Sequence, residues 1–115
     1  MPSNPEFENV FEALKKVLRK HERIFKVHKD DEHEYILVTK SGNHKGAPMW
    51  FAAVRCGKAY VSYHLMAVQP VSPELKKRMQ GKTCFNFKKI DPALFEELKT
   101  LTAAGVEIYR KQGWL

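Results

Sequence analysis

Residues 49–65, which read MWFAAVRCGKAYVSYHL, constrain the fold more than any other part of the chain. They form two runs rich in apolar and aromatic residues on either side of Gly57-Lys58, which is typical of a β-hairpin with a two-residue type II′ turn. Such a turn sets the register of the strands and places Trp50 opposite Leu65. One hairpin face is then apolar throughout, and we predict that it is core. It comprises Trp50, Ala52, Val54, Cys56, Ala59, Val61, Tyr63 and Leu65.

The opposite face of this hairpin has a composition that indicates binding. A sheet face that meets water normally carries more Lys, Glu and Thr, whereas this one offers aromatic rings, a guanidinium and an imidazole. Arg55 is predicted to lie beside Tyr60, and such a pair can hold a carboxylate or phosphate group. We therefore expect a site for a small anionic ligand, with a protein partner or a second copy of the chain as the alternative. Its predicted residues are Phe51, Arg55, Tyr60, Ser62 and His64.

The remaining periodicity predicts an α+β fold in one domain, residues 1–115. Residues 5–21 show the spacing of an amphipathic helix, and residues 23–40 alternate as a second hairpin. A short helix follows Ser72 and ends at Gly81, residues 83–89 form a strand, and Asp91 begins the last helix. We expect an antiparallel sheet of about five strands, with the N- and C-terminal helices packed on one face and the other face partly open.

Length and composition limit the class of protein. At 115 residues the chain can bury a core without a disulfide or metal, and 43% hydrophobic with 29% charged residues is an ordinary globular composition. No leader sequence or membrane span is expected, so we predict a cytoplasmic location. Cys56 and Cys84 lack CxxC spacing and are expected to be buried thiols. The net charge of +7 is compatible with an anionic partner, but net charge bears mainly on solubility and association.

Candidate metal ligands lie near the tip of the hairpin in residues 23–40. Imidazole and carboxylate groups at close spacing suit iron or zinc, and the candidates are His28, Asp30 and His33. The alternative is a solvated turn, which we favour because exposed turns rarely hold their ligands in place.

Nucleic acid is a second alternative partner. Lys76, Lys77, Arg78 and Lys82 could contact phosphates, but no set of base-reading residues accompanies them. Any such binding would be electrostatic, and we favour a solvated basic surface.

Neither an enzyme nor a cofactor is expected. Ser62 and His64 point the same way, but two residues along a strand separate them by about 7 Å, too far for direct proton transfer. No GxGxxG or P-loop spacing is present to cradle phosphates.

Three segments of the chain together resemble the YdhG-like family of small bacterial domains. They are residues 47–65 (APMWFAAVRCGKAYVSYHL), residues 81–89 (GKTCFNFKK) and residues 90–111 (IDPALFEELKTLTAAGVEIYRK). The resemblance implies the family's α+β fold, in which most members have no assigned function. One branch is described as frataxin-like iron chaperones, which makes iron transfer an alternative here. We expect a non-enzymatic YdhG-like binding module that uses the open sheet face.

Overall fold

The protein is described by a computed structural model that covers residues 5–40, 48–67, 71–81 and 83–114. Three helices and six strands follow one another in these residues. They are α1 (Pro5–Arg19), β1 (Phe25–Asp30), β2 (Glu34–Thr39), β3 (Trp50–Cys56), β4 (Val61–Leu65), α2 (Pro73–Lys76), β5 (Met79–Gln80), β6 (Cys84–Phe87) and α3 (Pro92–Lys111).

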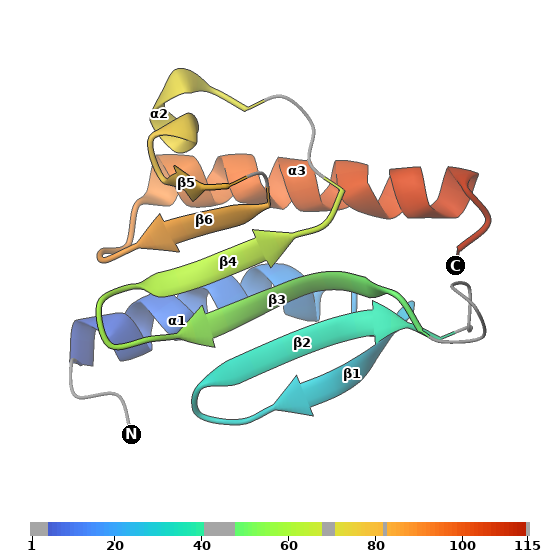
Figure 1. Cartoon of the computed structure of the whole chain (residues 1–115), viewed down its shortest axis with the longest axis horizontal. Helices are drawn as coiled ribbons and strands as arrows, with labels where there is room; N and C mark the ends of the chain where they lie inside the picture. Colours follow the sequence, from blue (N-terminus) through green and yellow to red (C-terminus); the bar gives the residue numbers. More distant parts are fainter. Residues whose placement is uncertain (1–4, 41–47, 68–70, 82, 115) are drawn as a thin grey trace.

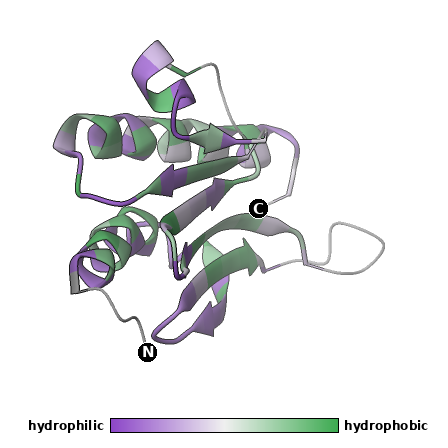
Figure 2. Ribbon diagram, turned by 60° about the vertical axis from the view of Figure 1, so that its left-hand side comes forward, coloured by the Kyte–Doolittle hydropathy of each residue, from purple (hydrophilic) through white to green (hydrophobic). Residues whose placement is uncertain are grey.

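The strands form an antiparallel sheet with the order β1-β2-β3-β4-β6-β5. The two long helices, α1 and α3, lie on the same side of this sheet (Figures 1 and 2). The predicted α+β class is therefore confirmed, with one strand more than expected. The extra strand is β5, because Met79 and Gln80 pair with β6 instead of ending the short helix.

Both long helices follow from their sequences. In α1 the spacing of Val10, Leu14 and Leu18 puts them on one face, where all three are fully buried. In α3 the carboxylate of Asp91 accepts a hydrogen bond from the backbone N–H of Leu94, which caps the helix at its start. Each helix therefore presents an apolar stripe to the sheet, and these stripes form the main core.

A β-bulge in β3 changes which side chains of that strand face the core. Leu37 of β2 pairs with Ala52, but the next residue, Val38, pairs with Trp50, so Phe51 is an extra residue in the ladder. Phe51 and Ala52 consequently both turn towards the helices, and Phe51 has no exposed surface. Trp50 is 48% exposed. The prediction that Trp50 lies in the core and Phe51 on the open face was wrong, because strict alternation fails at the bulge.

Phe51 is held by an aromatic cluster that joins β1, β3 and α3. Its ring stacks on Phe25, with 4.2 Å between centroids, and meets Tyr109 edge-on at 5.1 Å. The Tyr109 hydroxyl donates a hydrogen bond of 2.5 Å to the carbonyl oxygen of Trp50. A Cβ at Gly105 would lie 3.1 Å from the carbonyl oxygen of Ala67, so the absence of a side chain lets α3 approach the sheet closely.

The turn between β3 and β4 is longer than predicted. Cys56 pairs with Val61, and the N–H of Gly57 donates to the carbonyl oxygen of Tyr60, so residues 57–60 form a four-residue connection. Among the described glycines only Gly81 and Gly113 have a positive φ, so Gly57 lacks the conformation that a type II′ turn requires. Tyr60 therefore lies in the turn. The prediction that Tyr60 is the cross-strand partner of Arg55 was wrong, because Arg55 pairs with Ser62.

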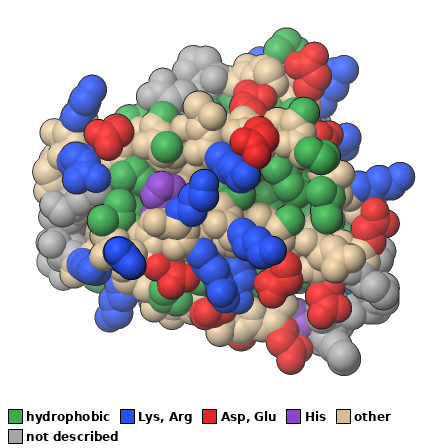
Figure 3. Space-filling model, turned by 180° about the vertical axis from the view of Figure 1, so that it is seen from behind, with side chains coloured by type: hydrophobic (Ala, Val, Ile, Leu, Met, Phe, Trp, Pro, Cys, Tyr) green, Lys and Arg blue, Asp and Glu red, His purple; other side chains and the backbone are tan. Residues whose placement is uncertain are grey.

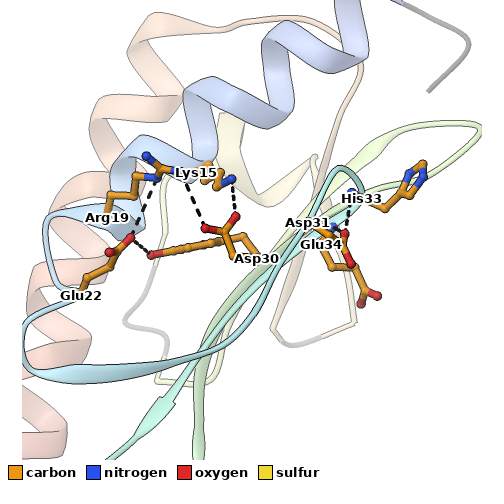
Figure 4. A network of polar contacts seen from close by, with 8 residues as sticks. Lys15, Arg19, Glu22, Asp30, Asp31, His33 and Glu34 are labelled. Atoms are coloured by element: carbon orange, nitrogen blue, oxygen red, sulfur yellow. Dashed lines mark hydrogen bonds and ion pairs between the residues drawn. The ribbon is translucent and has the colours of Figure 1, made fainter. Parts of the chain in front are cut away.

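An ion pair joins α1 to the last residue of β1, Asp30 (Figure 4). The Lys15 side chain is only 9% exposed, and its Nζ lies 2.5 Å from Oδ1 of Asp30. The same ammonium group lies over the rings of Phe11 and Tyr35, at 5.7 and 5.4 Å from their centroids. The Tyr35 hydroxyl donates to the carboxylate of Glu22. Buried polar groups at this helix–sheet junction therefore have partners.

We predict that Phe51→Ala lowers the free energy of unfolding by about 3–5 kcal/mol, because it empties a fully packed site. Trp50→Ala should cost about 1 kcal/mol or less, because that side chain is half exposed. Urea denaturation of the two variants measures the difference. Equal losses, or a larger loss for Trp50→Ala, would contradict the bulge.

We predict that Asp30→Asn lowers the free energy of unfolding by about 1–2 kcal/mol, because it leaves the Lys15 charge without its carboxylate. The loss is limited because the Asp30 side chain is partly exposed to solvent. In the Lys15→Met, Asp30→Asn double variant the combined cost should be smaller than the sum of the single costs. Urea denaturation of all four proteins completes the cycle. Additive costs would show that the pair contributes no coupling energy.

Candidate functional site

The sheet face opposite the helices carries two adjacent rows of polar side chains. In one row the pairing of β3, β4 and β6 places Arg55 beside Ser62 and Ser62 beside Asn86. In the next row His64 lies beside Cys84, and Cys84 beside Gln80. Neighbours in a row are about 5 Å apart, since that is the spacing between strands. The rows therefore bring groups from β3, β4, β5 and β6 to one surface.

Apart from Asn86, the residues of these rows line the floor of an open groove with a volume of about 1000 Å³. Four of the five predicted binding residues line it. They are Arg55, Tyr60, Ser62 and His64. The turn residues 57–59, which include Lys58, also line the groove. The fifth predicted residue, Phe51, lies in the core on the other side of the sheet and is no part of the groove.

Hydrogen bonds hold much of the groove floor in place. The amide oxygen of Gln80 accepts from the Tyr60 hydroxyl at 3.2 Å and from the Asn86 amide nitrogen at 2.8 Å. The amide oxygen of Asn86 accepts from the Ser62 hydroxyl at 3.1 Å and from the Cys84 thiol at 3.3 Å. This connected network fixes the side-chain orientations of the floor before any ligand is present.

Arg55 differs from these residues because its charge is uncompensated. It is exposed, and within the described part of the chain its guanidinium forms no hydrogen bond or ion pair. Glu34 lies directly across from it on β2, but the Glu34 carboxylate is bound to Lys29 at 2.7 Å. A planar group of hydrogen-bond donors is therefore available at the groove.

His64 and Cys84 are two titratable side chains that meet on the groove floor. The Cys84 Sγ lies 3.9 Å from Nε2 of His64. Burial lowers the pKa of His64 from its ordinary value of 6.5, and the charge of Arg55 lowers it further. Burial also raises the pKa of the Cys84 thiol. Both groups are therefore uncharged at neutral pH.

Sequence reasoning missed the contributions of Gln80, Cys84 and Asn86. All three come from β5 and β6, which lie far from the central hairpin in sequence. The sequence holds a signal for two of them, because the apolar Phe85 and Phe87 alternate with Cys84 and Asn86, which alternation turns to the opposite face of the strand. The missing step was the pairing of β6 with β4.

The predicted metal ligands do not converge. The Asp30 carboxylate faces α1 and is bound to Lys15, while His28 lies exposed in β1 and His33 in the hairpin tip. The Asp31 carboxylate accepts hydrogen bonds from the backbone N–H groups of His33 and Glu34, at 2.8 and 2.9 Å (Figure 4). Within the described residues no group of three His, Cys, Asp or Glu side chains is placed to hold a metal ion.

Three of the predicted phosphate contacts lie away from the groove walls. Lys76 ends α2, and Lys77 and Arg78 follow it, all three with exposed side chains. Lys82 lies outside the described residues. This basic cluster remains a separate surface.

None of the described helices combines the length and the apolar character that a membrane crossing requires. The chain matches no family model, no curated protein and no solved structure. The resemblance to the YdhG-like family therefore stays a prediction, and function has to be argued from the groove itself.

Proposed function

We propose that this protein is a non-enzymatic binding module whose ligand is a small anion held in the groove of the open sheet face. The single observation that carries the proposal is the exposed Arg55 guanidinium, which has no partner in the described residues and lies on a floor of fixed hydrogen-bonding groups. A guanidinium accommodates a carboxylate or phosphate through two parallel hydrogen bonds. Lys58 adds a second positive charge at the groove.

The distribution of charge supports an anion rather than a cation. The six described strands contain two carboxylates, Asp30 and Glu34, and each is bound to a lysine. The side of the molecule that carries the helices is different, because acidic and basic side chains are interspersed over it (Figure 3). Glu34 also lines the groove, but its carboxylate is bound to Lys29. The positive charges of Arg55 and Lys58 therefore favour an anionic ligand there.

The two alternative functions have less support. Carboxylates of α1 and the hairpin tip do line a smaller hollow of about 430 Å³, but Lys15 lies among them and is bound to Asp30. A cation there would have to compete with an ammonium group that is already in place. The basic cluster around Lys76 offers phosphate contacts, but the described residues add no recognisable base-reading set to it.

We predict that sulfate and succinate bind in the groove and perturb the NMR signals of the Arg55 side chain, Tyr60 and His64. Arg55→Gln should weaken binding by about tenfold or more, because a hydrogen bond to a charged group is lost. Lys76→Gln removes the same charge from α2 and is the matched control, which should bind like the wild type. Equal weakening by both substitutions would mean that only net charge matters, and the groove proposal would fail.

We predict that sulfate affinity rises as the pH falls from about 7.5 to about 5.5, because protonated His64 attracts an anion. By linkage, bound sulfate must then raise the pKa of His64, which in the free protein lies below the ordinary value of 6.5. Sulfate stays doubly charged throughout this range, so the ligand itself does not titrate.

His21 is the internal control for this titration. Its pKa is also lowered, by burial and by the charge of Lys20, but it follows α1 and does not line the groove. Proton NMR of the two imidazoles with and without sulfate should show an upward shift of the His64 pKa alone. A shift of both, or of neither, would argue against an anion beside His64.

A further inference from the structure

The groove exposes one of the two cysteines to a bound ligand. Cys84 is partly exposed on the floor, where its Sγ lies 3.9 Å from Nε2 of His64. Cys56 is buried and belongs to the core cluster between sheet and helices. The pairing of β4 with β6 places His64 directly opposite Cys84, so the thiol and the imidazole are neighbours because of the sheet register.

The separation between Arg55 and Cys84 sets how long a ligand must be to contact both side chains. Arg55 is on β3 and Cys84 is on β6, with β4 between them, so their strands are about 10 Å apart. His64 lies between the two and feels the charge of Arg55. A ligand that reaches from the guanidinium to the thiol must therefore carry its anionic group several bonds away from the atom that meets the sulfur.

We propose that Cys84 undergoes thiol–disulfide exchange with a small disulfide that bears a carboxylate and binds in the groove, a step that rests on the proposed anion-binding function. The Cys84 sulfur attacks one sulfur of the ligand, a new S–S bond forms and the ligand's own S–S bond breaks. The Cys84 S–H, which donates to the Asn86 amide oxygen in the free protein, first rotates towards His64. In the tautomer that leaves Nε2 unprotonated, His64 Nε2 takes the thiol proton and passes it to the departing thiolate. One protein thiol and one disulfide thus become one mixed disulfide and one small thiol, so atoms and electrons balance.

The surroundings of Cys84 explain why this exchange needs the imidazole and why its product persists. Burial keeps the Cys84 thiol protonated, so a neighbouring base is required to generate the attacking thiolate. The reverse reaction must expel the Cys84 thiolate, and a thiolate of raised pKa leaves slowly. His64 is uncharged near neutral pH because its own pKa is lowered, and it can therefore accept the proton.

Oxidised glutathione, a disulfide with several carboxylates, is a suitable probe for the reduced wild-type protein. Intact-mass spectrometry should show one glutathionyl adduct, and peptide mapping should place it on Cys84 and not on Cys56. Cys84→Ser should give no adduct. Mapping the wild-type protein identifies the site directly, so the result does not depend on the folding of a variant. An adduct on Cys56, or equal labelling of both thiols, would overturn the proposal.

Charge selectivity separates this exchange from the ordinary reactivity of a surface thiol. Arg55→Gln should slow the reaction with oxidised glutathione by about tenfold, because an anchoring charged hydrogen bond is lost. The rate with the neutral 2-hydroxyethyl disulfide should change much less, only through the effect of the lost charge on the pKa of His64, and Lys76→Gln should change neither rate. If both disulfides respond equally to Arg55→Gln, the carboxylate plays no part and the proposal is wrong.

The role of His64 has its own readout. His64→Gln should slow exchange with both disulfides, and the wild-type rate should rise with pH as the His64 imidazole loses its proton. A rate in the His64→Gln variant equal to the wild-type rate would show that the imidazole takes no proton.

Sulfate binding to Cys84→Ser distinguishes failure of this proposal from failure of the proposed function. If sulfate binds through Arg55 but the wild-type protein forms no adduct, only the exchange reaction is refuted. If neither occurs, both proposals are refuted.

Discussion

The β-bulge at Phe51 is the constraint on which the two faces of this sheet depend. One extra residue in β3 lets Phe51 and Ala52 both pack towards the helices, and it moves Trp50 to the opposite side. The aromatic contacts of Phe51 with β1 and α3 then tie the sheet edge to the C-terminal helix. Beyond the bulge alternation resumes, so that Ala53 and Arg55 face outward. Arg55 is therefore turned to the face that carries the groove, while the ring of Phe51 lies in the core.

The general fold could be predicted from the sequence because it depends on periodicity alone. The spacing of apolar residues in α1 and the alternation in β6 report burial directly, whatever the exact pairing. Most residues of the groove could also be predicted, although the predicted two-residue turn between β3 and β4 was wrong. The true register moves the pairing by two residues, and a shift of two leaves each side chain on its original face. Arg55, Ser62 and His64 therefore stayed together.

Two features could not be predicted because they depend on contacts between distant segments. The bulge at Phe51 is favoured by Phe25 and Tyr109, which come from opposite ends of the chain. Nothing in the local sequence around Phe51 distinguishes an extra residue from a regular one. The Cys84–His64 contact likewise needs β6 to pair with β4, although α2 and β5 separate them in the chain. Long-range pairing, rather than local preference, decided both.

The bulge also places the two tryptophans of the molecule in different layers, because it turns Trp50 away from the core. Trp50 is half exposed on the sheet face that carries the groove, whereas Trp114 meets the ring of Tyr109 edge-on at 5.0 Å beyond the end of α3. One indole thus senses the solvent above the open face, and the other senses the aromatic cluster on the helix side. Variants that each keep one of the two tryptophans can therefore follow the two layers of the protein separately by fluorescence, without any label being attached.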